Sequence, residues 1–152
     1  MGLDMYLYAK RYVSEYSEDT KEVSKQLQEI TKGVRGGMGN LQYIVTEAIY
    51  WRKANAIHNW FVKNVQYGID DCREYDVPIE KLQELLTVIK TCIKKPKKIP
   101  ELLPPTSGFF FGSTEIDEWF IASLKTTKKE LEKVIKESHG GYLWEFSYRS
   151  SW

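Results

Sequence analysis

Residues 50–61 combine aromatic side chains with groups that bind phosphates, amides and base edges. Their pattern predicts a helix over residues 50–65, in which positions three or four apart share a side. The polar members that such a helix would bring together are Arg52, Asn55, His58 and Asn59. If Trp51 and Trp60 wall the same place, these groups could hold phosphate and base edges while an indole stacks. The alternative is a solvated polar face with His58 satisfied at its edge.

Residues 108–120 form a second segment that could bind a ligand, because hydroxyl and carboxyl groups follow a run of phenylalanines. In an extended chain Phe110 points away from the phenylalanines on either side of it. We therefore expect Phe110 to offer a stacking platform while its neighbours pack on the core. Ser113 or Asp117 could then bond a ribose hydroxyl or an amide. Three carboxylates in the first turn of the helix that follows would repel a phosphate from its N-terminus.

Catalysis has little support in the sequence. His58 would need a nucleophile and an orienting acid, but the only other histidine is His139 and no serine lies in a G-x-S-x-G motif. Asp70 and Asp71 are adjacent, which favours a turn over a pair of metal ligands. The glycine-rich residues 33–40 lack the G-x-x-x-x-G-K-[ST] motif of nucleotide triphosphatases. We predict no catalytic residue, no metal and no cofactor.

Charge and composition restrict the partners. The chain has 22 Lys and Arg against 21 Asp and Glu, and a net charge of +1 provides no field to steer it onto nucleic acid or an anionic membrane. Cys72 and Cys92 are widely spaced, which fits free thiols in a reducing compartment. The sequence has neither an apolar run of the ~20 residues that span a membrane nor a signal-peptide pattern. We expect one soluble cytoplasmic domain, residues 1–152, with no polymeric nucleic acid or membrane as partner. Its oligomeric state is left open, a homo-oligomer included.

The hydrophobic pattern predicts an α+β fold. Alternating residues predict strands near 3–12, 43–46 and 144–149, with a short strand or a core-packed loop at 108–112. Helical spacing and helix-start signals predict helices near 17–33, 50–65, 78–93 and 114–138, the last ended by Gly140 and Gly141. The proline-rich residues 94–105 should be extended. We expect a small, mainly antiparallel sheet with adjacent N- and C-terminal strands, packed on one face by about four helices.

Several blocks of the sequence resemble a family of small phage and prophage accessory proteins. The blocks are residues 3–8 (LDMYLY), 50–62 (YWRKANAIHNWFV), 70–72 (DDC), 108–114 (GFFFGST), 117–120 (DEWF) and 150–152 (SSW). The resemblance spans nearly the whole chain. It implies an accessory protein in the cytoplasm of a bacterial host, and it implies no particular activity.

Small nonstructural phage proteins often inhibit host processes, and one strategy is to sequester the nucleotide signal of an antiphage defence system. Aromatic platforms with Arg, Asn and His between them suit that task, because each stacked base contributes ~1–3 kcal/mol. By this analogy the first hypothesis is a nonenzymatic inhibitor of host defence that binds a nucleotide-derived signalling molecule. The second is a protein-interaction inhibitor that docks on a host defence protein. The third is a nucleotide-acting hydrolase or transferase with His58 as acid or base.

Overall fold

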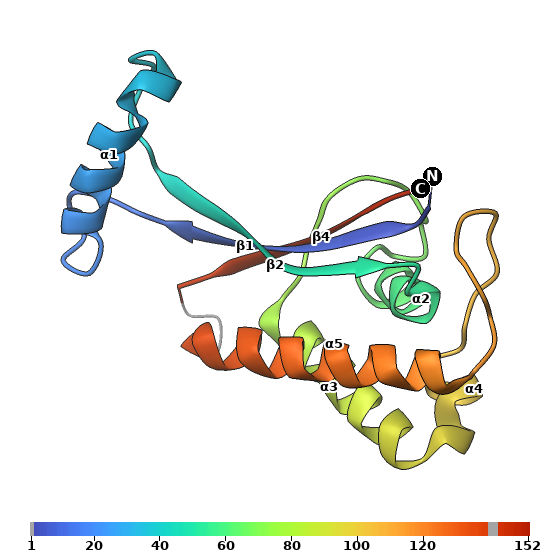
Figure 1. The fold of residues 1–152 in the computed structure, drawn as a ribbon. Helices are drawn as coiled ribbons and strands as arrows, with labels where there is room; N and C mark the ends of the chain where they lie inside the picture. Colours follow the sequence, from blue (N-terminus) through green and yellow to red (C-terminus); the bar gives the residue numbers. More distant parts are fainter. Residues whose placement is uncertain (1, 140–142) are drawn as a thin grey trace.

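Four strands form one sheet in the computed structural model of the chain, which describes residues 2–139 and 143–152 (Figure 1). The strands are β1 (Asp4–Tyr12), β2 (Tyr43–Arg52), β3 (Tyr75–Asp76) and β4 (Glu145–Ser151), in the spatial order β2-β1-β4-β3. Each pair of neighbouring strands is antiparallel. Because β1 and β4 are neighbours, the predicted α+β fold with adjacent terminal strands is confirmed.

β1 lies inside the sheet and carries apolar or aromatic side chains on both faces. Met5 and Leu7 are fully buried, while Tyr6 and Tyr8 are half-buried on the opposite face, where their rings stack. The alternation of β4 is also as predicted, because Phe146 and Tyr148 are buried. Residues of both terminal strands therefore alternate between the core and the outer face of the sheet.

β2 is longer than its sequence pattern predicts. The strand continues to Arg52, which pairs with Asp4 of β1, and helix α2 (Asn55–Asn64) begins only after it. The prediction of a helix from residue 50 is therefore wrong over residues 50–54. Pairing with β1 and burial of the Trp51 indole decide the local conformation, as tertiary context commonly does in strands.

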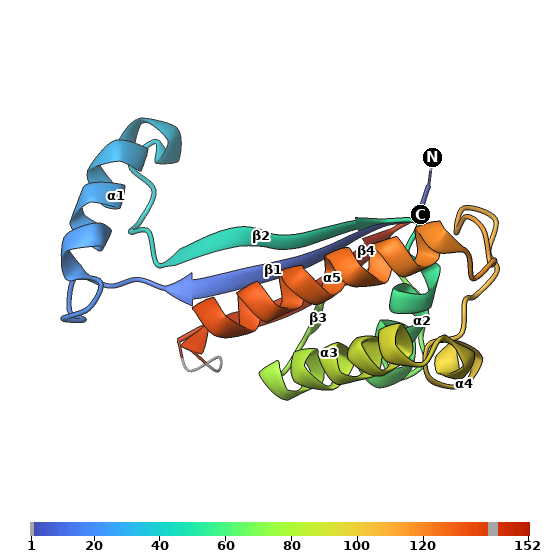
Figure 2. The ribbon, with the colours of Figure 1, turned by 60° about the horizontal axis from the view of Figure 1, so that its bottom comes forward.

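Helices α2, α3 (Ile79–Lys94) and α5 (Glu118–Glu137) cover one face of the sheet (Figure 2). The apolar stripe of α3 buries Leu82, Leu85 and Ile89, and α3 packs along α5. Nε1 of Trp51 donates a hydrogen bond to Oγ1 of Thr127, 3.0 Å away, which ties β2 to α5. The core thus lies between the sheet and these three helices.

The connection between α3 and α5 contains more helix than its prolines suggest. It forms the 3₁₀ turn η1 (Pro96–Lys98) and α4 (Ile99–Leu102), each with a proline at its first or second position. Proline fits there because the first N–H groups of a helix have no partner within it. The prediction of an extended connection is therefore wrong over residues 96–102.

The segment that precedes α5 is a loop. Its Phe111 is buried, and its Phe110 carbonyl accepts a hydrogen bond from the Leu3 amide at 3.1 Å. Asp117 caps α5, because its Oδ1 accepts a hydrogen bond from the Phe120 amide at 2.8 Å. The helix end predicted at Gly140 and Gly141 lies outside the described residues.

The β1–β2 hairpin extends beyond the sheet and carries α1 (Lys21–Arg35) at its end (Figures 1 and 2). We call residues 13–42 the arm. Within the arm, the Gln28 side chain bonds both the amide and the carbonyl of Leu41, at 3.0 and 3.1 Å. α1 ends at Arg35, and the next residue, Gly36, has a φ of 58° in the left-handed region that glycine adopts without strain. The predicted end at Gly33 is therefore two residues early.

Candidate ligand-binding site

A hollow of about 200 Å³ lies between the start of α2 and the start of α5. We call it the α2–α5 hollow. Four predicted site residues line it, namely Arg52, Asn55, Ser113 and Asp117. The segments 50–61 and 108–120 therefore meet here, although the predicted helix of the first segment begins only at Asn55.

The junction of β2 with α2 contributes two basic residues to the lining of this hollow. Arg52 is the last residue of β2, and its guanidinium is exposed, with Nε 3.9 Å from Oδ1 of Asp4. Lys53 follows with a φ of 56°, a left-handed conformation that costs a residue other than glycine about 1 kcal/mol. The Lys53 amide donates a 2.7 Å hydrogen bond to the Leu3 carbonyl, which holds the turn in place. Strain of this kind is concentrated at functional sites.

The hollow has a basic side and an acidic side. α2 has no acidic residue in its first turn and no side-chain cap at Ala54, so the positive end of its dipole adds to Arg52 and Lys53. On the opposite side lie Glu115 and Asp117. The carboxylates that argued against phosphate at the start of α5 therefore leave the start of α2 as the better place for an anion.

An exposed indole supplies an aromatic wall. Trp119 lines the hollow while 83% of its surface remains exposed. Phe120 and Leu124 of the same helix also line the hollow and give it an apolar floor. Trp119, Lys53 and Glu115 were not predicted as site residues, although Trp119 lies in the block 117–120 and Lys53 in the block 50–62.

Asn55 organises the wall of the hollow from within the protein. Its Nδ2 donates to the carbonyls of Phe111 and Ser113, at 3.1 and 2.8 Å, and its Oδ1 accepts from the Thr106 amide at 3.1 Å. The side chain is buried, and all three bonds go to the loop before α5. Asn55 therefore fixes that loop to α2 rather than offering its amide to a ligand.

His58 lies in the core, where its accessible fraction is 1%. Its Nδ1 is 2.8 Å from the Tyr148 hydroxyl and its Nε2 is 3.0 Å from Oδ1 of Asp70. Because a carboxylate can only accept, Nε2 carries the proton in the neutral ring and donates it to Asp70, while the Tyr148 hydroxyl donates to Nδ1. Burial lowers the pKa of His58 and outweighs the opposing effect of Asp70. Burial likewise raises the pKa of Tyr148.

The other predicted residues do not reach the hollow. The indole of Trp51 is buried against Phe61, and Trp60 is buried beside α3. Asn59 donates to the Pro104 carbonyl at 3.4 Å. Phe110 is half-buried and meets the ring of Phe109 edge-on. The prediction that Phe109 packs on the core is wrong, because its ring is exposed. The polar convergence predicted for residues 52–59 therefore separates into an exposed Arg52 and three side chains bonded within the protein.

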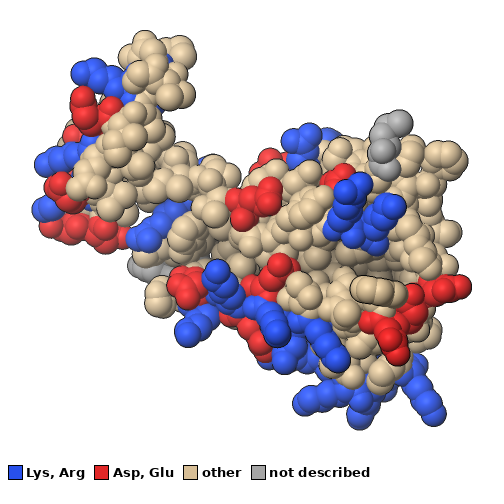
Figure 3. All heavy atoms as spheres, in the orientation of Figure 1, with Lys and Arg blue, Asp and Glu red and all other residues tan. Residues whose placement is uncertain are grey.

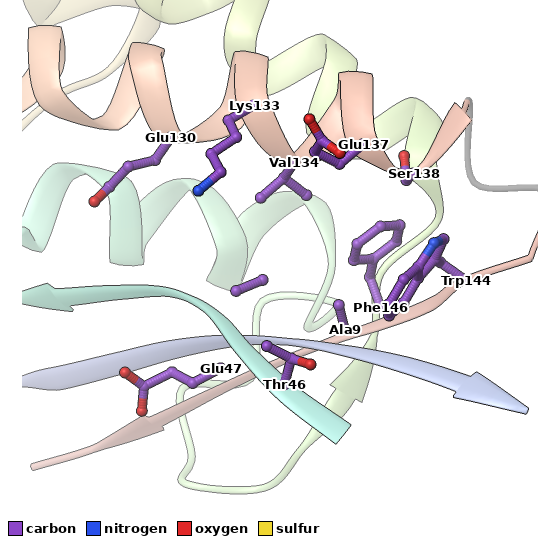
Figure 4. Close-up of a pocket in the computed structure, with 11 residues that line it drawn as sticks. Ala9, Thr46, Glu47, Glu130, Lys133, Val134, Glu137, Ser138, Trp144 and Phe146 are labelled. Carbon is purple, nitrogen blue, oxygen red and sulfur yellow. The ribbon is translucent and has the colours of Figure 1, made fainter. Parts of the chain in front are cut away.

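A second, larger hollow of about 370 Å³ lies between the sheet and the far half of α5 (Figure 4). Ala9, Val134 and Phe146 form its apolar surface, and charged side chains of β2 and α5 surround it. Burial raises the pKa of one of these, Glu130. No residue predicted as part of a site lies here, because the hollow forms only where α5 crosses the sheet.

The described part of the chain holds no group of three or more His, Cys, Asp or Glu side chains arranged to bind a metal ion. None of its described helices is both long and apolar enough to cross a membrane. Comparison with known proteins finds no matching family model, no matching curated protein and no matching solved structure.

Proposed function

We propose that this chain is a nonenzymatic binding protein that captures a small nucleotide-derived ligand in the α2–α5 hollow. The observation that carries the proposal is the meeting of two cations, a helix N-terminus, two carboxylates and an exposed indole around one cavity. Together these groups match the phosphate, the ribose and the base of a nucleotide.

The arrangement suggests a direction for the ligand. A phosphate would lie against Arg52 and Lys53, where the α2 amides and both cations favour negative charge. Ribose hydroxyls would donate to the carboxylates of Glu115 or Asp117. The base would stack on Trp119, and such stacking contributes ~1–3 kcal/mol. The hollow is small for a complete nucleotide, so the base would lie along the exposed indole rather than inside.

In the bacterial host, a phage protein of this kind would sequester a signalling molecule of antiphage defence. Three of the blocks that carry the resemblance to phage accessory proteins, residues 50–62, 108–114 and 117–120, contribute to the lining of the hollow. Those blocks would thus serve a common site. A protein that removes a signalling nucleotide needs tight binding and no chemistry.

The position of His58 weighs against the enzymatic alternative. Acid-base catalysis requires a side chain within hydrogen-bonding reach of the substrate. His58 is buried, bonds Tyr148 and Asp70 through its two ring nitrogens, and does not line the α2–α5 hollow. Its environment suits a structural role.

Ligand capture is tested by recording the melting temperature of the pure protein with a panel of cyclic dinucleotides and ADP-ribose derivatives. The ligand is then released by heat and identified by mass spectrometry. We expect at least one compound to stabilise the protein and to be recovered intact. A compound recovered in altered form would show an enzyme, and the absence of any shift would reject the proposal.

Matched variants locate the binding site. Arg52→Ala and Trp119→Ala should each abolish or strongly weaken the stabilisation by the ligand while the melting temperature of the free protein changes little. The controls are Lys63→Ala, which removes an exposed cation at the other end of α2, and Phe109→Ala, which removes an aromatic ring that is 95% exposed and outside the hollow. If the controls lose binding as the test variants do, the ligand binds elsewhere.

Docking on a host protein remains a second candidate, favoured by the exposure of Phe109 and Trp119. This function predicts a stable complex with one host protein that survives the Arg52→Ala change and is lost with Phe109→Ala. A complex with the opposite dependence would favour the hollow instead.

A further inference from the structure

Helix α1 carries an apolar stripe that its own chain leaves uncovered. Of the side chains in this stripe, Ile30 is 76% exposed, Val34 is 90% exposed and Val23 is also exposed, while Leu27 is half-buried. If α1 packed on the sheet or on the other helices through its apolar side, these side chains would be buried. Instead α1 contacts its own hairpin through a neighbouring side, where Ser24 is buried and Gln28 bonds Leu41.

The spacing within the stripe is that of a helix-pairing surface. Val23, Leu27, Ile30 and Val34 are separated by four, three and four residues, which is the spacing of core positions in paired helices. The stripe is also symmetric about its midpoint. If two copies of α1 lie antiparallel, Val23 of one faces Val34 of the other, and Leu27 faces Ile30. One helix is therefore complementary to a second copy of itself, as a two-fold interface requires.

The charges of α1 are placed so that two copies do not repel each other. The residues flanking the stripe are uncharged, namely Ser24, Gln26, Thr31 and Gly33. The charged residues lie away from it, namely Lys21, Glu22, Lys25, Glu29, Lys32 and Arg35. In the space-filling view, charged side chains gather along one edge of the arm beside a broad uncharged surface (Figure 3). A partner helix with charged residues beside its own apolar stripe would find no charges beside the stripe of α1 to pair with them, whereas a second copy has the same uncharged flanks.

We propose that α1 is the surface through which two copies of this chain associate, with the two helices antiparallel about a two-fold axis. The arm holds α1 away from the sheet and its helices, so two arms can meet while the two bodies remain apart (Figures 1 and 2). A 15-residue helix is marginal by itself. The hydrogen bonds between the Gln28 side chain and Leu41 hold α1 on the hairpin before it pairs. This inference does not depend on the function proposed for the α2–α5 hollow.

The oligomeric state tests the inference directly. Sedimentation equilibrium of the full chain, from about 1 µM to about 1 mM so as to cover weak association, should show a reversible dimer. The double variant Ile30→Glu, Val34→Glu should raise the dissociation constant at least tenfold. The control Lys25→Gln, Lys32→Gln makes the same change in net charge on the far side of α1 and should leave it unchanged. A monomer throughout, an unaffected Glu variant or an equally weakened control would overturn the proposal.

Cross-linking tests the orientation and does not depend on a destabilised variant. In a background with the exposed Cys72 replaced by Ser, chains carrying Val23→Cys are mixed with chains carrying Val34→Cys and oxidised. Antiparallel pairing brings positions 23 and 34 together, so disulfides should join unlike chains, since a disulfide needs Cα atoms within ~7 Å. Disulfides that form mainly between two Val23→Cys chains would indicate parallel helices and would overturn the proposal.

Discussion

Nε2 of His58 lies 3.0 Å from Oδ1 of Asp70, and the His58 ring is buried while the Asp70 carboxylate reaches the surface. Burial lowers the pKa of His58, so the folded state binds a proton on this ring less readily than the unfolded state. The neutral His58 ring therefore contributes fully to the free energy of unfolding above about pH 6.5, and this contribution is lost as the pH falls below that value. Denaturant unfolding should show a lower free energy at pH 5 than at pH 7.

Three variants isolate this pH effect. His58→Gln should remove most of the slope between pH 7 and pH 5, whereas His139→Gln at the exposed histidine should retain it. Asp70→Asn removes the partner that favours the protonated ring and should make the acid destabilisation steeper. An unchanged slope in His58→Gln would mean that other groups are responsible.

Asn55 should matter more for stability than its neighbour Asn59. Asn55→Ala removes three hydrogen bonds from the loop before α5 and leaves the freed groups without partners, at a cost of about 2–4 kcal/mol. Asn59→Ala loses one long bond to Pro104 and should cost less than about 1 kcal/mol. Urea denaturation of both variants checks the difference, and equal losses would contradict the structural role given to Asn55.

Two substitutions of Lys53 separate the effect of its backbone strain from the effect of its charge. Lys53→Gly and Lys53→Ala both remove the ammonium group, but only glycine adopts the left-handed φ without strain. The Gly variant should therefore be about 1 kcal/mol more stable than the Ala variant, measured by thermal unfolding. Ligand binding, compared by calorimetry, should weaken to the same extent in both. Stronger binding by the Gly variant than by the Ala variant would show that strain, not charge, limits recognition.

Phe109 and Phe111 should differ sharply despite their similar positions in the sequence. Phe111 is buried, with its ring edge-on to His58 at a centroid distance of 5.1 Å, so Phe111→Ala should cost about 3–5 kcal/mol. Phe109 is exposed, and Phe109→Ala should change stability by no more than about 0.5 kcal/mol. Chemical denaturation compares them, and a large loss for Phe109 would place its ring in the core.

Local sequence patterns were sufficient to predict the strands and helices whose apolar residues recur at regular spacing. The alternation of Met5 and Leu7 with Tyr6 and Tyr8 predicts an interior strand, and α3 follows from its apolar stripe alone. The predicted α+β class and adjacent terminal strands rest on such patterns. Helix boundaries were predicted less accurately. Proline disrupts the interior of a helix but fits its first turn, as it does within residues 96–102.

The site depended on partners distant in the sequence. Helical spacing placed Arg52, Asn55 and His58 on overlapping sides, but it cannot show that Arg52 ends a strand, that Asn55 bonds residues 106–113, or that Tyr148 holds His58. The role of a buried polar side chain depends on the group that hydrogen-bonds to it, and only the tertiary structure brings that group near. The sequence by itself determined which residue types the protein has for binding a nucleotide-like ligand. The packing of α2 and α5 on the sheet decided which of them face a cavity and which support the core.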